Sequence, residues 1–156
     1  VELHPSQDGS RIRYIKGTWS SIDTKQKEII VDESLTVPQV STKFTGFADM
    51  PPVFATAYMV GFVEWTCVEA LHPYLEPQQR TVGTHVNLSH NAATPVGMKV
   101  TAEVTLTHIE GKKLTFAVIC RDEVDVICEG THERFIIDHE KFLTRVQAKS
   151  AATNEH

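Results

Sequence analysis

The sequence has no uninterrupted apolar run of the length that a membrane-spanning helix requires. Such a helix needs about 18 or more consecutive apolar residues, and the most apolar segment, residues 51–71, is interrupted by Glu64 and Glu69. The segment VELHPSQDGS at residues 1–10 lacks a basic stretch followed by an apolar one, so no signal peptide is expected. We therefore expect a cytoplasmic protein with no membrane partner.

Basic residues are also few, and this shortage argues against a nucleic-acid-binding protein. The chain has 15 Lys and Arg against 20 Asp and Glu, which gives a formal net charge of −5. Its densest basic positions are isolated pairs such as Lys112 with Lys113, and these do not form the continuous positive surface that binds a phosphate backbone. One or two local cations can still hold a phosphorylated small molecule such as coenzyme A.

Cysteine is scarce, which argues against a fold that depends on disulfides. The three cysteines, Cys67, Cys120 and Cys128, all lie in apolar helix or strand patterns, where a thiol acts as a small hydrophobic group. Cys120 and Cys128 can face each other across a hairpin centred near Val124, but a reducing cytosol favours free thiols. We predict no metal site and no cofactor.

The length and the remaining composition fit one globular domain. A chain of 156 residues, of which 41% are hydrophobic and 22% charged, is long enough to bury a substantial core. We take residues 1–156 as a single domain. Within it, 1–27 is expected to be an N-terminal extension with an extra strand, and 147–156 a frayed tail.

Hydrophobic periodicity predicts strands before and after one long helix. The β-branched segments 11–17 and 28–36 are predicted to pair with each other. A helix is predicted from about Phe54 to Leu71, because Pro73 disfavours helical geometry at the residue before it. Four later strands are predicted at 81–94, 98–109, 114–120 and 126–138.

This order of elements indicates an α+β fold. The helix is apolar on nearly all sides, since Phe62, Trp65 and Val68 lie outside its main apolar stripe. Such a helix must be surrounded. The simplest arrangement is a curved antiparallel sheet that wraps around it, with the last four strands as a meander.

A carboxylate in the middle of this helix is the strongest indication of function. At 100° per residue, one stripe contains Thr56, Val60, Val63, Glu64, Cys67 and Leu71. A buried, unpaired carboxylate is costly, so it changes its pKa or finds a partner, and either outcome suits an acid–base or nucleophilic site. The alternative is a structural glutamate that caps a neighbouring loop.

The strand predicted at 81–94 offers a histidine to the same site. Alternation places Gly83, His85, Asn87 and Ser89 on one face, and Thr84, Val86, Leu88 and His90 on the other. His90 ends the strand just before a turn, so its imidazole can reach into a site from a rigid support. The alternative is a partly exposed histidine that is hydrogen-bonded to backbone.

Three segments together resemble a known family. PPVFATAYMVGFVEWTCVEALHPYLEP, VGTHVNLSHNAATPVG and GTHER, between about Val37 and Val146, are similar to the hotdog-fold acyl-CoA thioesterases, and most similar to the fluoroacetyl-CoA thioesterase branch. The resemblance implies a hotdog fold, with a curved antiparallel sheet wrapped around one long central helix, and hydrolysis of an acyl-CoA. It also implies a homodimer, or a dimer of such dimers, with residues from two chains completing each site near the interface.

The resemblance assigns the catalytic residues by motif to Thr56 at the helix start, Glu64 two turns later and His90 in the following strand. Thioester hydrolysis needs a nucleophile or an activated water, a base, and donors for the oxyanion. We hypothesise that Glu64 with His90 activates the attack, while Thr56 orients the nucleophile or shares its role. Backbone N–H groups at the helix start can stabilise the oxyanion.

Four further residues are expected to bind substrate. The resemblance implies that Gly83 lines the acyl pocket, where a side chain would block the thioester, and that Arg134 shapes the site or holds the coenzyme A end. We add Met50 and Phe54 from the approach to the helix. Met50 stands where the fluoroacetyl-specific member has a lid phenylalanine, with Phe47 three residues earlier, so another small or medium acyl-CoA is expected.

Two other functions are compatible with the same fold. A hotdog enoyl-CoA hydratase would carry an Asp and a His a few residues apart before the helix, but residues 38–52 contain no His. A non-catalytic acyl-CoA binding or sensing protein would keep the pocket and lose the base, whereas Thr56, Glu64 and His90 are all present.

Overall fold

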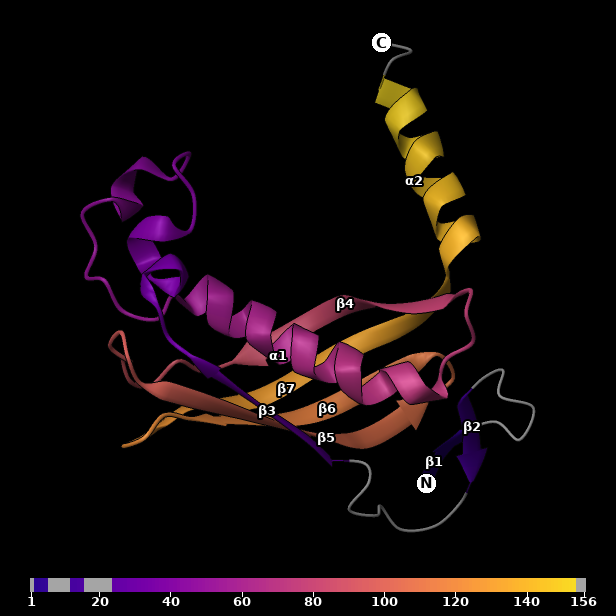
Figure 1. The fold of residues 1–156 in the computed structure, drawn as a ribbon. Helices are drawn as coiled ribbons and strands as arrows, with labels where there is room; N and C mark the ends of the chain where they lie inside the picture. The colour runs from indigo at the N-terminus through magenta and orange to yellow at the C-terminus, as the bar shows by residue number, and fades with distance from the viewer. Residues whose placement is uncertain (1, 6–11, 16–23, 154–156) are drawn as a thin grey trace.

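A five-stranded sheet that curls around one long helix forms the body of the protein (Figure 1). The computed structural model describes residues 2–5, 12–15 and 24–153. The sheet has the order β3–β5–β6–β7–β4, and every neighbouring pair is antiparallel. Its strands are β3 (Thr24–Ile30), β4 (Gln79–Leu88), β5 (Lys99–Glu110), β6 (Lys113–Arg121) and β7 (Val126–Asp138). The predicted α+β class, with a curved antiparallel sheet around a central helix, is confirmed.

The central helix, α1 (Thr56–Leu71), lies against the concave face of the sheet (Figure 1). Short 3-10 turns lead into it and out of it: η2 (Glu33–Leu35), η3 (Val37–Gln39), η4 (Thr45–Phe47) and η5 (His72–Tyr74). The predicted helix began two residues earlier, but Phe54 and Ala55 are extended because their N–H groups bond to the carbonyls of Thr94 and Leu35. No helix in the described part of the chain is long and apolar enough to span a membrane.

The core lies between α1 and the sheet, and it shows that the predicted apolar stripe was rotated. The buried residues of α1 are Met59, Phe62, Val63, Thr66, Cys67 and Leu71. Thr56 is exposed and Glu64 only half-buried, so both lie at the margin of the buried face. Trp65 and Val68 are 46% and 41% exposed, so one chain does not surround the helix as predicted.

The N-terminal pairing was predicted wrongly. The strand β2 (Ile12–Ile15) pairs with β1 (Glu2–Pro5), and these two form a separate sheet. The strand β3 pairs instead with β5, ends at Ile30, and begins at Thr24 inside the segment assigned to the 1–27 extension. The pattern of a strand does not identify its partner, because pairing depends on contacts that are distant in sequence. Residues 11, 16 and 17 of the predicted strand lie outside the described residues.

The predicted four-strand meander is correct for β5, β6 and β7 and wrong for β4. The chain leaves β4 at Leu88 and crosses through residues 89–98, so β4 pairs with β7 at the far edge of the sheet. Gly97 in this crossover has φ of 99°, a conformation that suits glycine. The consequence is that β4, next to the predicted site, is an edge strand with one neighbour among the described strands.

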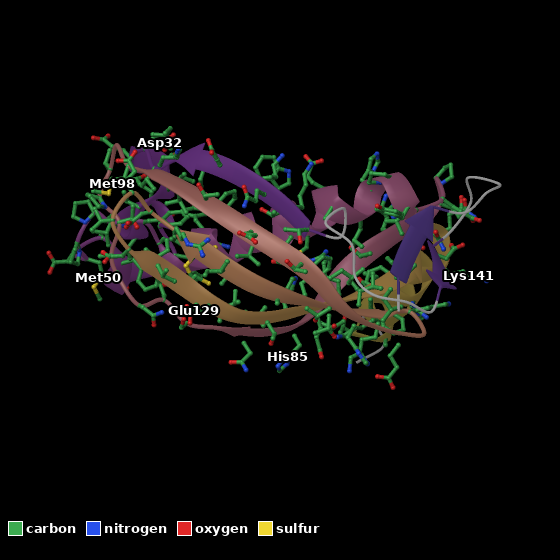
Figure 2. All side chains as sticks on the ribbon, turned by 90° about the horizontal axis from the view of Figure 1, so that it is seen from below. Asp32, Met50, His85, Met98, Glu129 and Lys141 are labelled. Carbon is green, nitrogen blue, oxygen red and sulfur yellow. The ribbon has the colours of Figure 1, made fainter. Side chains whose placement is uncertain are left out.

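A β-bulge in β4 also overturns the predicted alternation. Gly83 is opposite Arg134 and His85 is opposite Glu133, so Thr84 is an additional residue on this strand. Gly83 and His85 therefore face opposite sides of the sheet, and the side chain of His85 projects from the strand away from the ribbon (Figure 2). The strand ends at Leu88, so His90 lies on the following loop rather than in the strand.

The C-terminal segment forms α2 (His139–Thr153), which projects from the end of β7 (Figure 1). None of its residues is buried. The tail 147–156 is helical as far as Thr153, in keeping with the high helix propensity of its alanines, and its fraying stays a prediction. Residues 154–156 lie outside the described part of the chain.

Candidate active site

Thr56 and His90 form a hydrogen-bonded pair at the start of α1. The hydroxyl Oγ1 of Thr56 lies 2.7 Å from Nδ1 of His90. Thr56 is the first residue of the helix, and the loop that carries His90 is fixed to β7 on both sides. Ser89 and Asn91 donate their backbone N–H groups to the carbonyls of Glu129 and Ile127. The helix start and a pinned loop thus bring together two of the three predicted catalytic residues.

The environment of His90 suits a base. Its Nε2 atom is buried and has no hydrogen-bond partner among the described residues. Burial lowers the pKa of His90 below its ordinary value of 6.5, so the imidazole is neutral at neutral pH. Both residues of the pair open onto a pocket of about 260 Å³. Its other lining residues are Val37, Val53, Phe54, Asn91, Ala92 and Ala93.

Glu64 lies in a second cluster, farther along the helix. It follows Thr56 by eight residues, which places it about 12 Å along the helix axis. Its Oε2 accepts a hydrogen bond of 2.9 Å from Nη1 of Arg134, whose side chain is 6% exposed, whereas that of Glu64 is 40% exposed. Within one chain, His90 is therefore paired with Thr56 and Glu64 with Arg134.

Arg134 is held by a network on β4 and β7. Its Nε donates to the hydroxyl of Thr81 and its Nη2 to the carbonyl of Thr81, both at 2.9 Å. Its Nη1 also lies 3.1 Å from Nε2 of His132. All three nitrogens of the guanidinium are engaged inside the chain, which favours a role in shaping the site over a contact with the coenzyme A end.

His132 is the buried centre of this network. Its Nδ1 lies 2.8 Å from the backbone carbonyl of His85, and the residue has no exposed surface. Burial lowers the pKa of His132, and the charge of Arg134 lowers it further, against the opposite effects of the His85 carbonyl and Glu64. Neither His132 nor Thr81 was predicted from the sequence as a site residue. The signal was present in GTHER, because alternation places His132 on the same face of β7 as Arg134.

Gly83 leaves the space that the Glu64 carboxylate occupies. A Cβ atom at this position would lie 2.6 Å from Oε2 of Glu64, 3.2 Å from Cε1 of His132 and 3.3 Å from Nη1 of Arg134. A side chain here would therefore collide with the Glu64 carboxylate. The acyl-pocket role of Gly83 stays a prediction.

Met50 and Phe54, the remaining predicted substrate-binding residues, lie in different surroundings. Phe54 is 1% exposed and lines the Thr56–His90 pocket. Met50 is 48% exposed, lies at the opposite end of the molecule from Lys141, and does not line that pocket (Figure 2).

The cysteines take no part in either cluster through hydrogen bonds. All three are free and buried. Cys67 follows Glu64 by three residues on α1. Burial raises the pKa of its thiol to about 12, which keeps the thiol neutral. Cys120 and Cys128 are directly opposite each other on β6 and β7, as the hairpin pattern predicted. The described residues contain no group of His, Cys, Asp and Glu placed to hold a metal ion.

The sheet and helix define a protein of the hotdog class. A hot-dog-like protein from Thermanaerovibrio acidaminovorans has the same fold, with a TM-score of 0.69 at 22% identity over 81% of this chain and 89% of that chain. The chain belongs to the fluoroacetyl-CoA-specific thioesterase family, whose model matches residues 31–140. The inferred resemblance, placed between about Val37 and Val146, is thereby confirmed as far as residue 140.

Individual relatives agree with this family. The fluoroacetyl-CoA thioesterase of Streptantibioticus cattleyicolor is 43% identical over 125 residues, which are 80% of this chain and 90% of that protein. The structure of a mutant fluoroacetyl-CoA thioesterase in complex with fluoroacetate has a TM-score of 0.79 at 41% identity, over 81% of this chain and 95% of that chain. These likenesses favour a thioesterase over the hydratase and the sensor.

Proposed function

We propose that this acyl-CoA thioesterase hydrolyses a small or medium acyl-CoA to the free acid and coenzyme A, with Thr56, His90 and Glu64 as catalytic residues. The observation that carries the assignment is the 2.7 Å contact between Thr56 Oγ1 and His90 Nδ1 at the mouth of a pocket. A hydroxyl bonded to a neutral imidazole is the arrangement of a nucleophile and its base.

In the proposed mechanism, Nδ1 of His90 accepts the proton that the nucleophile loses. When Nδ1 of His90 is unprotonated, Thr56 donates its hydroxyl hydrogen to it and Nε2 carries the ring hydrogen. During attack, His90 takes the proton from Thr56, or from a water that Thr56 holds, and the imidazole becomes charged. The thioester carbonyl oxygen then gains negative charge beside the backbone N–H groups at the start of α1, which can stabilise it.

The third member of the site comes, in this proposal, from a second copy of the chain. A charged His90 needs an acceptor at Nε2, and that atom is buried without a partner among the described residues. A carboxylate would serve, as the acidic member of a nucleophile–histidine–acid triad does. Glu64 of the same chain lies about 12 Å from Thr56 along the axis of α1, too far to reach His90, so Glu64 of the second copy is the proposed partner.

The edge strand β4 supports the homodimer. Its neighbour in the sheet is β7 on one side, and no described strand lies on the other side. Val86 on this strand is 46% exposed, an unusual setting for an aliphatic residue at a sheet edge. A second copy that joins β4 would extend the sheet and bring the two α1 helices together. The exposed Trp65 and Val68 offer an additional apolar surface for a dimer of dimers.

The pocket beside Thr56 favours a short acyl chain. Its volume of about 260 Å³ is near the lower limit of ligand pockets, and most of its lining residues are apolar. Met50 in place of the lid phenylalanine argues against selectivity for fluoroacetyl-CoA. We expect acetyl-, propionyl- or butyryl-CoA to be hydrolysed at least as fast as fluoroacetyl-CoA.

The proposal is tested by the release of free thiol from a series of acyl-CoAs. The wild type is compared with Thr56→Ala, Glu64→Gln and His90→Ala, and each is expected to lower kcat by at least about 100-fold. Undiminished turnover in both Glu64→Gln and His90→Ala would exclude the mechanism. Tight acyl-CoA binding without thiol release from any member of the series would establish the sensor instead.

We also place the enzyme in the cytoplasm, where free thiols persist; the three free cysteines support this. Fractionation of the source cells tests the location. Activity recovered outside the cytoplasmic fraction would overturn it.

A further inference from the structure

Three side chains from two elements of the fold converge over Gly83. Glu64 comes from α1, whereas His132 and Arg134 come from β7, and a Cβ at Gly83 would lie within 3.3 Å of an atom of each. Nη1 of Arg134 lies between the other two, at 2.9 Å from Oε2 of Glu64 and 3.1 Å from Nε2 of His132. The proposed catalytic mechanism uses Glu64 and gives no role to His132.

The hydrogen bonds determine the protonation state of His132. A backbone carbonyl can only accept, so the contact of 2.8 Å with the carbonyl of His85 requires a hydrogen on Nδ1. Arg134 can only donate, so the contact of 3.1 Å with its Nη1 requires a lone pair on Nε2. Both contacts are satisfied by a single species, the neutral Nδ1–H tautomer.

This tautomer uses the second hydrogen of Nη1. One N–H of that nitrogen points to Glu64 and the other to His132, while Thr81 accepts from Nε and Nη2. Without the His132 acceptor, Thr81 and the half-exposed Glu64 would still hold the guanidinium, but one hydrogen of Nη1 would be a buried, unsatisfied donor. Such a donor is unfavourable, so the guanidinium would turn away from this position.

We propose that His132 is a positioning residue that orients the Arg134 guanidinium and thereby fixes the Glu64 carboxylate over Gly83. The proposal rests on the proposed function, because the position of Glu64 matters to turnover only if Glu64 is catalytic.

The surroundings of His132 keep it neutral. The charged groups that act on it are Arg134 and Glu133 from β7 and Glu64 from α1. Its register partners on the two neighbouring strands, Phe116 on β6 and Val86 on β4, are apolar. Burial is the strongest influence and lowers the pKa of His132, so the acceptor at Nε2 is retained at neutral pH.

Two amide substitutions separate the two contacts of the ring. In His132→Gln the terminal amide reaches the place of Nε2, so its oxygen can accept from Arg134. In His132→Asn the shorter amide reaches only the place of Nδ1, so it can donate to the carbonyl of His85 but offers Arg134 nothing. Neither the Gln nor the Asn side chain titrates. Both are polar, and neither is larger than the His side chain.

Thiol release and thermal unfolding are measured for both variants, with His108→Asn on the exposed part of β5 as the matched control. His132→Asn is expected to lower kcat by about 10- to 100-fold, the effect of a displacement of about 1 Å at a reacting group, with KM little changed. His132→Gln is expected to restore most of that loss, although both variants lose one hydrogen bond.

Equal values of kcat in the two variants, whether both low or both like the wild type, would overturn the proposal. If His132→Asn does not fold, His132→Leu replaces it, since leucine fills the site and offers no acceptor. Glu64→Gln is measured in the same assay. Loss of activity in Glu64→Gln beside full activity in His132→Asn refutes the positioning role alone, whereas full activity in Glu64→Gln refutes the proposed catalytic role and the positioning role with it.

Discussion

The substitution Gly83→Ala tests the geometry of the Glu64 carboxylate with a single methyl group. The new Cβ would lie 2.6 Å from Oε2 of Glu64, whereas ordinary van der Waals contact begins at 3.4 Å. The carboxylate must therefore retreat by about 0.8 Å, the difference of these two distances. It is 40% exposed, so it can turn toward solvent, but only by weakening its contact with Arg134.

The displacement predicts a loss of rate with little loss of stability. A shift of about 1 Å at a reacting group costs up to about 100-fold in rate, so a fall in kcat of about 10- to 100-fold is expected for acetyl-CoA. Gly83 does not have a positive φ, so alanine fits its backbone and lowers the entropy of the unfolded chain. This effect stabilises by about 0.4–1 kcal/mol and offsets part of the strain.

The assay is thiol release beside thermal unfolding, with Gly61→Ala as the control. Gly61 lies on the exposed side of α1 and nothing is within 4 Å of an added Cβ, so the same chemical change there should leave kcat unaltered. Wild-type kcat in Gly83→Ala would refute the reasoning, because it would show that the position of the carboxylate is not constrained. A large fall in Tm would refute it as well, since the loss of activity would then follow from unfolding.

Three other predictions concern His90, Gly130 and Thr94. Because burial lowers the pKa of His90, the rate should be full above that pKa and fall as the pH drops through it; a midpoint of kcat/KM above 6.5 would contradict this. Gly130 has φ of 150°, and a Cβ there would lie 1.9 Å from the carbonyl oxygen of Asn87. Gly130→Ala should therefore lower the free energy of unfolding in urea by at least about 2 kcal/mol, and an unchanged midpoint would exclude the predicted clash. Thr94→Val removes the 2.8 Å hydrogen bond from a buried hydroxyl to Asp122, and should cost about 1 kcal/mol in the same experiment; a gain in stability would contradict the expectation.

The elements that the sequence predicted well are those whose pattern is local. The alternation from Val100 to Leu106 is the buried face of β5, and the apolar run before Pro73 is α1. The pairing of β4 with β7 was not predictable in this way, because both partners of an antiparallel pair carry the same period and the long crossover leaves the choice to tertiary packing. The bulge at Thr84 could not be predicted either, because a bulge is defined by the register with the opposite strand.

In the candidate site, too, the contact that depends on local structure was predicted, and the contacts that depend on the tertiary fold were not. Thr56 and His90 were expected to meet, and they do so because each lies next to the boundary of a regular element. The expected partnership of Glu64 with His90 does not form within one chain, because Glu64 follows Thr56 by eight positions on the helix and so lies too far from His90. Arg134 was expected to shape the site or hold coenzyme A, but its pairing with Glu64 was not predicted, since its charge is visible in the sequence whereas its burial depends on the sheet.

The spacing of eight positions between Thr56 and Glu64 means that the length of α1 fixes the distance between them. An insertion of one residue between them would move the carboxylate about 1.5 Å along the axis and turn it by about 100° around it. Glu64 would then leave the margin of the buried face and point either into the apolar interior or into open water, away from Arg134. This part of the helix can therefore change in composition but not in length, and we expect relatives that keep both residues to keep seven residues between them.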